Sequence, residues 1–338
     1  MTTKIIYLLG AGASYGTREN GKLVRGVPVV NELENTIRQL IYDLEGEQSA
    51  SEEARNRVIK LLEWLANKCK EFPTIDTYAK LLYVTKQEDE YKKLKNALSL
   101  FFTLLQITYA RDLRYDGFIA SLINENRKFP DKMKILSWNY DSQFELAFGE
   151  YISPLTDTGR HITRIWKELN TSDKLTAKSI NDDFGIVKLN GSATSLYPNY
   201  HGSVDRLVDL FYPLFAEGED EIVVCDRIFI SKEYEYRNTL SFAWEQEQGF
   251  FENIAKKIKE VTTLVVIGYS FPYVNREIDR MLFQCMPNLE TIYIQDREPR
   301  LIQENIEATM SDSQKSFQGG IDFRLRINLN QFVIPSEL

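Results

Sequence analysis

The sequence predicts an α/β fold: a Rossmann-like parallel sheet with helices on both faces, plus an inserted helical module. Short apolar runs alternate with helical patterns, and strands that alternate with helices form parallel sheets. A long stretch, residues 31–126, shows helical spacing and no convincing strand, which predicts the inserted module. The apolar runs that we expect to form the sheet are residues 5–9, 133–138, 184–189, 263–268 and 289–294.

The insertion divides the chain into two parts. We expect residues 1–30 and 131–338 to form the Rossmann-like domain, and residues 31–130 to form the helical module. Pro130 marks the end of the module because proline cannot continue a helix. The four helices expected within it have their apolar positions at residues 33–44, 58–69, 75–82 and 94–105.

The first strand, Ile5–Leu9, runs into a turn rich in small residues, Gly10–Ser14. Glycines allow a sharp bend and let a ligand approach the backbone closely. If a helix follows, its N-terminal N–H groups favour a phosphate, and a dinucleotide pyrophosphate is the usual occupant. The alternative is a tight turn with no ligand. Tyr15 stands where the dinucleotide pattern G-x-G-x-x-G has its third glycine, so we do not expect a simple dehydrogenase domain.

Residues 17–30 are polar and read as an ordered loop over this turn, either a lid or a plain connector. Gly16–Lys22 has the glycine and lysine spacing of a P-loop. Leu23 then replaces the Ser or Thr that would hold magnesium, and no strand directly precedes the run. We therefore exclude a P-loop.

Polar residues follow the next two expected strands. The strand at residues 133–138 runs into Asn139 and Asp141, and the strand at residues 184–189 ends at Asn190. Open α/β sheets bind ligands at the carboxyl ends of their strands, where these side chains are expected. Asp141 has a second interpretation, as the cap of the helix that follows it.

The second half of the chain is less regular. Residues 151–182 read as irregular, residues 222–230 as small strands, and residues 238–260 as one long amphipathic helix. The clearest strand of the chain, at residues 263–268, is followed by Ser270 and by a helix near 277–283.

Composition narrows the class of protein. Of the 338 residues 43% are hydrophobic, enough for a packed core, and the net charge of −8 argues against a broad nucleic-acid surface. No apolar run approaches the length of a membrane span. Cys69, Cys225 and Cys285 lie far apart and form no C-x-x-C pair, so we expect neither a zinc site nor disulfides. We expect a cytoplasmic protein with no metal.

Four motifs taken together, LLGAGAS, SWNYD, KLNGS and VVIGYSFP, resemble the sirtuin family. They look most like the zinc-free sirtuin-like domains of bacterial anti-phage defence proteins. The resemblance implies an NAD+ hydrolase that uses NAD+ as substrate and cleaves the nicotinamide–ribose bond to nicotinamide and ADP-ribose. Depletion of NAD+ would then stop an infected cell.

The resemblance also implies where NAD+ is bound. Its pyrophosphate would lie on the first turn, at Gly10, Ala11, Gly12 and Ser14. Phosphate and ribose would contact Gly268 and Ser270, and the adenosine ribose hydroxyls would bind Asp296, which follows the last expected strand. Asn139 and Asp141 would act in catalysis, Asn139 on the water or substrate near the nicotinamide ribose and Asp141 near the carboxamide.

Asn190 is the main departure from the family, because the motif there usually carries histidine. A neutral imidazole accepts a proton near neutral pH, whereas an amide cannot. His161 and His201 are the only histidines, and His201 is an alternative catalytic group. The chain is thus expected to be either a weak hydrolase, with Asn190 in the catalytic position, or a non-catalytic subunit that binds NAD+ or ADP-ribose.

The expected partners follow from the same reading. With both parts of the chain assigned, we expect no region of it to be left for recognising a phage. We therefore expect a separate protein partner, such as an ATPase or a nucleic-acid-guided sensor, and a homo-oligomer. We expect no membrane association and no strong direct binding of nucleic acid.

Overall fold

A computed structural model describes residues 4–46, 51–152, 162–173, 185–198, 208–209, 220–231, 236–245, 249–311 and 320–338. His161 and His201, and with them the alternative catalytic role of His201, lie outside these residues.

A seven-stranded sheet forms the centre of the protein, with the strand order β12-β11-β10-β1-β4-β6-β5. Every neighbouring pair is parallel. The predicted parallel sheet is therefore confirmed. The strands are β1 (Ile5–Leu9), β4 (Met133–Ser137), β5 (Thr171–Asp173), β6 (Ile186–Lys188), β10 (Thr263–Ile267), β11 (Thr291–Gln295) and β12 (Asp322–Arg326).

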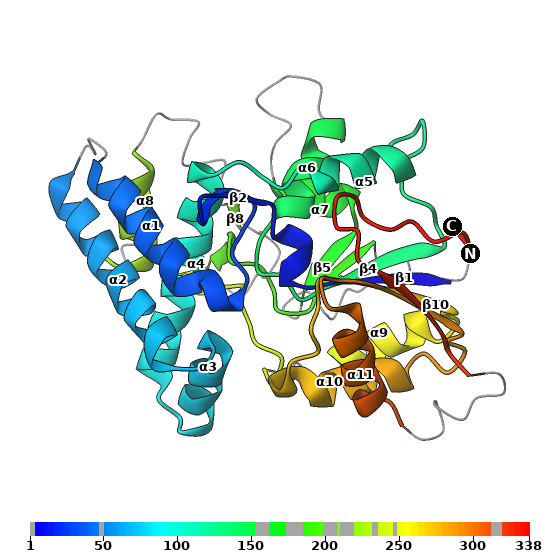
Figure 1. Ribbon diagram of the computed structural model, residues 1–338. Coiled ribbons are helices and arrows are strands. Elements are labelled where there is room, and N and C mark those ends of the chain that lie inside the picture. The colour runs from blue at the N-terminus through cyan, green and yellow to red at the C-terminus, as the bar shows by residue number, and fades with distance from the viewer. Residues whose placement is uncertain are drawn as a thin grey trace.

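Helices cover both faces of the sheet (Figure 1). On one face the sheet packs with α9 (Phe250–Ile258), α10 (Arg276–Gln284) and α11 (Pro299–Thr309). On the other face lie α5 (Arg114–Leu122), α6 (Gln143–Ile152) and α7 (Ile162–Glu168). The central strands β1, β4 and β10 are buried along their whole length because both of their faces are covered.

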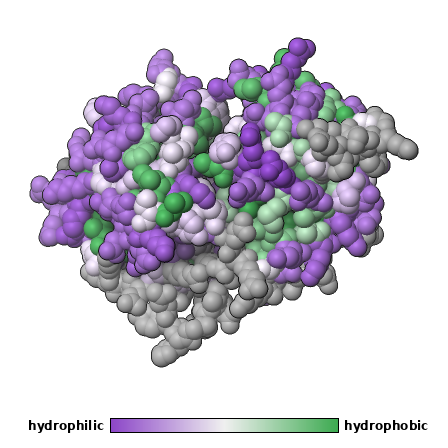
Figure 2. All heavy atoms as spheres, turned by 90° about the horizontal axis from the view of Figure 1, so that it is seen from below, coloured by the Kyte–Doolittle hydropathy of each residue, from purple (hydrophilic) through white to green (hydrophobic). Residues whose placement is uncertain are grey.

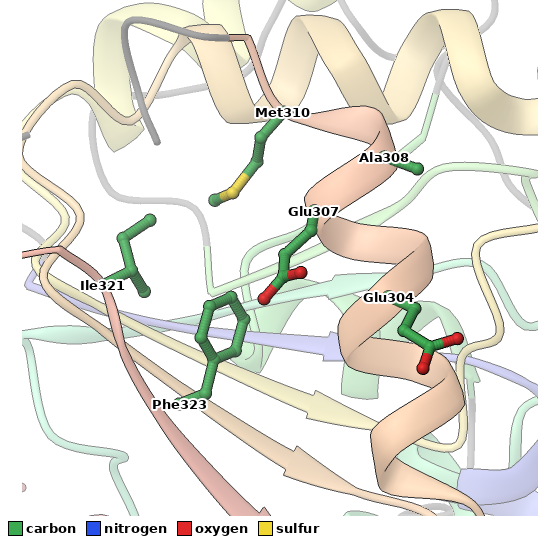
Figure 3. A pocket seen from close by; sticks show the side chains of 6 residues that line it. All are labelled: Glu304, Glu307, Ala308, Met310, Ile321 and Phe323. Carbon is green, nitrogen blue, oxygen red and sulfur yellow. The ribbon is translucent and has the colours of Figure 1, made fainter. Parts of the chain in front are cut away.

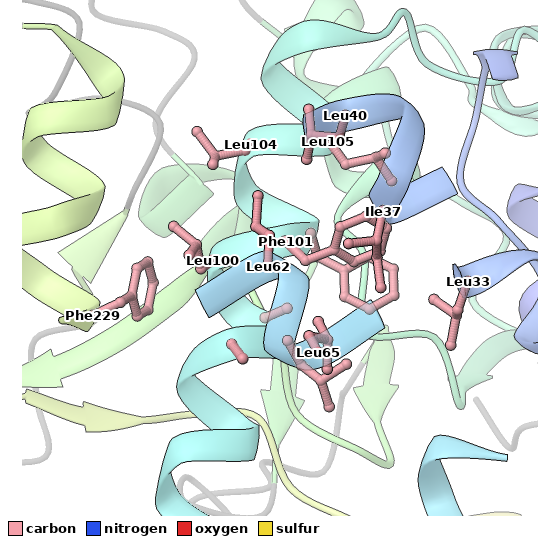
Figure 4. Close-up of a cluster of buried hydrophobic side chains, with 14 of the residues drawn as sticks. Leu33, Ile37, Leu40, Leu62, Leu65, Leu100, Phe101, Leu104, Leu105 and Phe229 are labelled. Atoms are coloured by element: carbon pink, nitrogen blue, oxygen red, sulfur yellow. The ribbon is translucent and has the colours of Figure 1, made fainter. Parts of the chain in front are cut away.

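Beside the sheet, four helices form a second hydrophobic core, as their spacing predicts: α1 (Leu33–Gly46), α2 (Glu52–Glu71), α3 (Ile75–Val84) and α4 (Glu88–Thr108). Residues far along the chain complete this core. Phe229 of α8 (Glu221–Phe229) packs into it beside Leu62 and Leu100 (Figure 4). The small antiparallel sheet β8 (Val208–Asp209), β7 (Ser195–Pro198) and β9 (Tyr236–Asn238) contributes Leu196. The domain boundaries at residues 30 and 130 stay a prediction.

Three expectations for the second half of the chain are wrong. Residues 221–229 form a helix because Asp220 caps it, its carboxylate accepting hydrogen bonds from the N–H groups of Ile222 and Val223. The amphipathic stretch from residue 238 is not one helix, because Asn238 ends a strand that pairs with β7 and α9 begins only at Phe250. The stretch read as irregular contains α7 and β5.

The loop expected over the first turn is a β-hairpin, β2 (Thr17–Glu19) with β3 (Lys22–Arg25). Asn20 and Gly21 make its tip, both with positive φ, as a two-residue hairpin turn requires. Figure 2 shows the molecule from below the view of Figure 1, and on this face hydrophobic areas interrupt a mainly hydrophilic surface. No helix among the described residues is both long and apolar enough to span a membrane.

Candidate functional site

Four of the predicted strand ends meet at one edge of the sheet. β10, β1, β4 and β6 are neighbours, so the segments that follow them lie side by side. These segments contain Gly268, the turn Gly10–Ser14, Asn139 and Asn190. The chain leaves β1 for β4 on one side and later returns to β10 on the other, so β1 and β10 flank the topological switch point. Ligands of open α/β sheets bind outside such a point.

Ser14 is the centre of a buried hydrogen-bond network at this edge. Its hydroxyl donates to the carboxylate of Asp141 at 3.1 Å and accepts from the Asn139 side-chain amide at 3.1 Å. Tyr115 lies 2.8 Å from the same oxygen. A hydroxyl has one hydrogen to donate, so the Tyr115 O–H must donate to Ser14. Three of the predicted residues are thus joined directly, and all of them are buried.

Tyr115 was missed by the sequence reasoning. It lies on α5, in the stretch that the sequence assigns to the helical module, and it reaches Ser14 only because α5 packs on the sheet. It shares a helical spacing with the apolar residues Phe118, Ile119 and Leu122, so nothing in the local pattern separates it from a core residue.

Asp141 has the capping role that the sequence left open as an alternative. Its Oδ1 accepts a hydrogen bond from the Gln143 N–H at 2.9 Å, at the start of α6. Burial raises the pKa of Asp141, while the nearby Lys188 ammonium opposes this shift. Lys188 Nζ donates to the Asp141 carbonyl at 2.5 Å and pairs with Glu145 at 3.2 Å, which fixes this strand end to β6.

Asn190 faces a different environment from the Ser14 network. Its Nδ2 donates to the backbone carbonyl of Trp138 at 3.2 Å, and this carbonyl can only accept, so the Oδ1 must point the other way. Asn190 is 6% exposed, and its Oδ1 has no hydrogen-bond partner among the described residues. Unpaired buried acceptors are uncommon in folded proteins. The group that completes this site must therefore be a hydrogen-bond donor.

The first turn does not offer its N–H groups as the sequence suggests. The N–H groups of Gly10 and Gly12 donate to the carbonyls of Ile267 and Gly268, so two expected phosphate donors bind protein instead. The turn continues as a 3-10 helix, Ala11–Ser14, and not as an α-helix. The expected α-helical N-terminus is thus absent here. Ala11 lies between these two glycines and is partly exposed. No backbone acceptor for its N–H group is found among the described residues.

The glycines serve the contact between two turns. A Cβ on Gly12 would lie 2.7 Å from the Cα of Gly268, and a Cβ on Gly10 would lie 2.6 Å from the Gly268 carbonyl oxygen. Gly268 itself has φ +59°, a conformation that side chains disfavour. These residues must be glycine whether or not a ligand binds.

The other two predicted residues follow the carboxyl ends of β10 and β11. Ser270 is exposed, and its carbonyl accepts from the Asn305 side chain. Asp296 is partly exposed at the end of β11, and its Oδ1 accepts from the Glu298 N–H before α11. The structure places both at the carboxyl edge but gives neither a hydrogen bond to the Ser14 network.

Beneath the β10 turn, Tyr269 connects the site to a buried acid. Its ring stacks on Trp138 with 5.7 Å between the ring centres, and its hydroxyl donates to a carboxyl oxygen of Asp279 at 2.8 Å. Asn275 donates to the Tyr269 oxygen at 3.1 Å. Burial raises the pKa of Asp279 to about 8, although the bond from Tyr269 opposes the shift. Asp279 therefore keeps its proton near neutral pH.

The hairpin is bound firmly to the first turn. The Val27 N–H donates to the Ser14 carbonyl at 2.7 Å, and the Gly16 N–H donates to Asp112 at 2.9 Å. Arg18 donates to the carbonyls of Tyr15 and Val27 and pairs with Glu32. These bonds hold the hairpin and the residues that follow it against the turn.

The edge also carries positive charge. The guanidiniums of Arg18 and Arg297 lie 4.1 and 4.4 Å from the ring centre of Tyr15. Among the described residues no group of three or more His, Cys, Asp or Glu side chains could hold a metal ion. A cavity of about 550 Å³ lies away from this edge, between α11 and the start of β12, where Phe323 and Met310 line it (Figure 3).

Comparison with known proteins gives little further guidance. The sequence matches no family model and no curated protein. Ten chains of solved structures are similar in fold. One is Sir2Tm bound to a propionylated peptide, which is 10% identical, with 87% of this chain and 81% of that chain covered and a TM-score of 0.38. A likeness this distant carries no argument about the site.

We predict that Gly12→Ala destabilises the protein by about 2 kcal/mol or more, because its Cβ would overlap the backbone of Gly268. Gly117→Ala is the matched control, since a Cβ there meets nothing within 4 Å and alanine favours the α5 helix. Urea unfolding should show a loss for the first and no loss for the second. Equal stabilities would show that the two turns are not in tight contact.

We predict that stability falls as the pH rises from about 5 to about 8 because of Asp279. The unfolded chain loses this proton above its ordinary pKa of 3.8, whereas the folded protein keeps it up to about 8. The loss should be at least about 1 kcal/mol. Asp279→Asn should remove this part of the pH dependence, measured by urea unfolding at both pH values. Parallel profiles for the two proteins would contradict the assignment.

Proposed function

We propose that the protein binds NAD+ at the carboxyl edge of its sheet and slowly cleaves the nicotinamide–ribose bond. The observation that carries this proposal is the convergence of the Gly10–Ser14 turn, Asn139, Asp141 and Asn190 at the switch point of a parallel sheet. The four motifs that resemble zinc-free sirtuin-like domains contain these same residues.

The orphaned oxygen of Asn190 supports the fit of NAD+ to this edge. A ribose hydroxyl or an attacking water is a donor, and a donor is what the buried Oδ1 lacks. Arg18 is neutralised by Glu32, so the guanidinium of Arg297 is the one that would supply positive charge for the pyrophosphate, in a chain whose net charge is −8. The Ala11 N–H would add one backbone donor. Ser270 and Asp296 would contact the adenosine half, on the β10–β11 side.

The rate should be low because the edge offers an amide where a base is useful. Loss of nicotinamide leaves a cation-like ribose carbon, as in glycoside hydrolysis. A base that removes a proton from the water or from a ribose hydroxyl contributes roughly 10²–10⁴-fold. Asn190 can hold such a group by accepting a hydrogen bond but cannot take its proton. Catalysis then rests on positioning by Asn139.

A second candidate, a subunit that binds NAD+ or ADP-ribose without turnover, is favoured by the same amide. In either case we propose a cytoplasmic role in anti-phage defence with a separate protein partner. The motif resemblance supports that setting, since the defence proteins it points to act by NAD+ depletion.

We predict that Asn139→Ala abolishes NAD+ consumption, because Asn139 would no longer position the reacting group. Asn288→Ala is the control, since Asn288 also donates through its side chain but lies exposed before β11, at the opposite edge of the sheet. Consumption is measured by loss of NAD+, and binding of ADP-ribose by calorimetry. If the parent protein shows neither consumption of NAD+ nor binding of ADP-ribose, both candidate functions are rejected.

We predict that Asn190→His raises the rate of NAD+ consumption by at least about tenfold, a modest share of a general base's effect. Asn190→Leu, which keeps the size and loses the acceptor, should weaken binding. If Asn190→His binds NAD+ but consumes it no faster than the parent, the binding-subunit reading replaces the hydrolase.

A further inference from the structure

We propose that two copies of this chain associate through β12, whose outer edge pairs antiparallel with the β12 of a second copy around a two-fold axis at Arg324. β12 ends the sheet, and among the described residues only β11 pairs with it. This interface is independent of the proposed function.

The peptide groups of β12 have the orientation that this pairing needs. The Asp322 N–H donates inward to Glu290, and the Arg326 carbonyl accepts inward from Asp296. Because peptide groups alternate along a strand, those of Phe323 and Leu325 face outward. With the axis at Arg324, Phe323 lies opposite Leu325 of the second copy and exchanges both hydrogen bonds with it.

The charges along the strand are self-complementary in this register. Asp322 lies opposite Arg326 of the second copy, and each dimer contains this pair twice. The peptide groups of Asp322 and Arg326 face β11, so these two residues form a non-hydrogen-bonded pair, the kind in which opposite side chains come closest together. Arg326 has no carboxylate partner among the described residues, and its Nη1 donates instead to the outward carbonyl of Leu325. In the dimer it would move to the second copy's Asp322.

The two Arg324 residues face each other at the axis. Each pairs with Glu337 of its own chain at 3.0 Å and also lies 2.7 Å from Asp322, whose second carboxylate oxygen remains for Arg326 of the second copy. Like charges facing each other across strands are unfavourable, and these carboxylates reduce that cost.

The register also covers apolar surface. Ile327 is 75% exposed, and continued pairing would set it against Ile321 of the second copy. Ile321 and Phe323 line the open cavity of about 550 Å³, together with Met310 (Figure 3). The exposed isoleucine of one copy would thus enter the cavity of the other.

The first test is a charge exchange. Analytical ultracentrifugation over about 1–200 μM should show a monomer–dimer equilibrium for the parent protein. Asp322→Arg and Arg326→Asp should each raise the dimer Kd by at least about tenfold, and the double variant should restore it. Ile327→Ser should also weaken the dimer, whereas Tyr42→Ser, which removes an equally exposed side chain on α1, should not.

The second test is a cross-link. Arg324→Cys should form a disulfide dimer on mild oxidation, because residues facing each other at the axis bring their Cα atoms to about 4.5 Å. Arg326→Cys is the control, since its two copies would lie about 13 Å apart along the strands. A parent protein that is monomeric throughout, charge reversals without effect, or equal cross-linking of the two cysteine variants would each overturn the proposal.

Discussion

The backbone contact between the turns after β1 and β10 is the constraint on which the rest of this structure depends. The Gly12 N–H donates to the Gly268 carbonyl, and no side chain fits on either residue. This contact directs the chain after β1 back across the sheet edge, which brings Ser14 to the end of β4. From there Ser14 reaches Asn139 and Asp141. The polar network at the edge thus follows from a steric requirement of the backbone.

Much of the sheet could be predicted from the sequence because its central strands are buried on both faces. β1, β4, β10 and β11 are continuous apolar or near-apolar runs, and such runs have few alternatives. The edge strands β5 and β12 escaped prediction because they are short or charged, and an edge strand can be both. The sequence of residues 222–230 favours small strands because its β-branched residues hide the helical spacing of the side chains that α8 buries.

The candidate site divides in the same way. Polar residues that directly follow a buried strand can be placed at the carboxyl edge of the sheet from the sequence, as Asn139, Asp141 and Asn190 were. Their hydrogen-bond partners could not be predicted in this way. Tyr115 reaches Ser14 from a helix more than a hundred positions away, and the glycine turn meets β10 across most of the chain's length. These contacts depend on tertiary packing, which local patterns do not record.

The edge separates two kinds of polar group, and this separation bears on its chemistry. Ser14, Asn139 and Asp141 satisfy one another, so a ligand that uses them must displace a bond that already exists. Asn190 is satisfied on one side only, so a donor placed at its Oδ1 gains a bond without breaking one. The free energy of binding should therefore come first from the β6 end of the site, with rearrangement of the Ser14 network as a later and costlier step. Under the proposed function, such an order would let a second event, such as assembly or contact with a partner, control turnover.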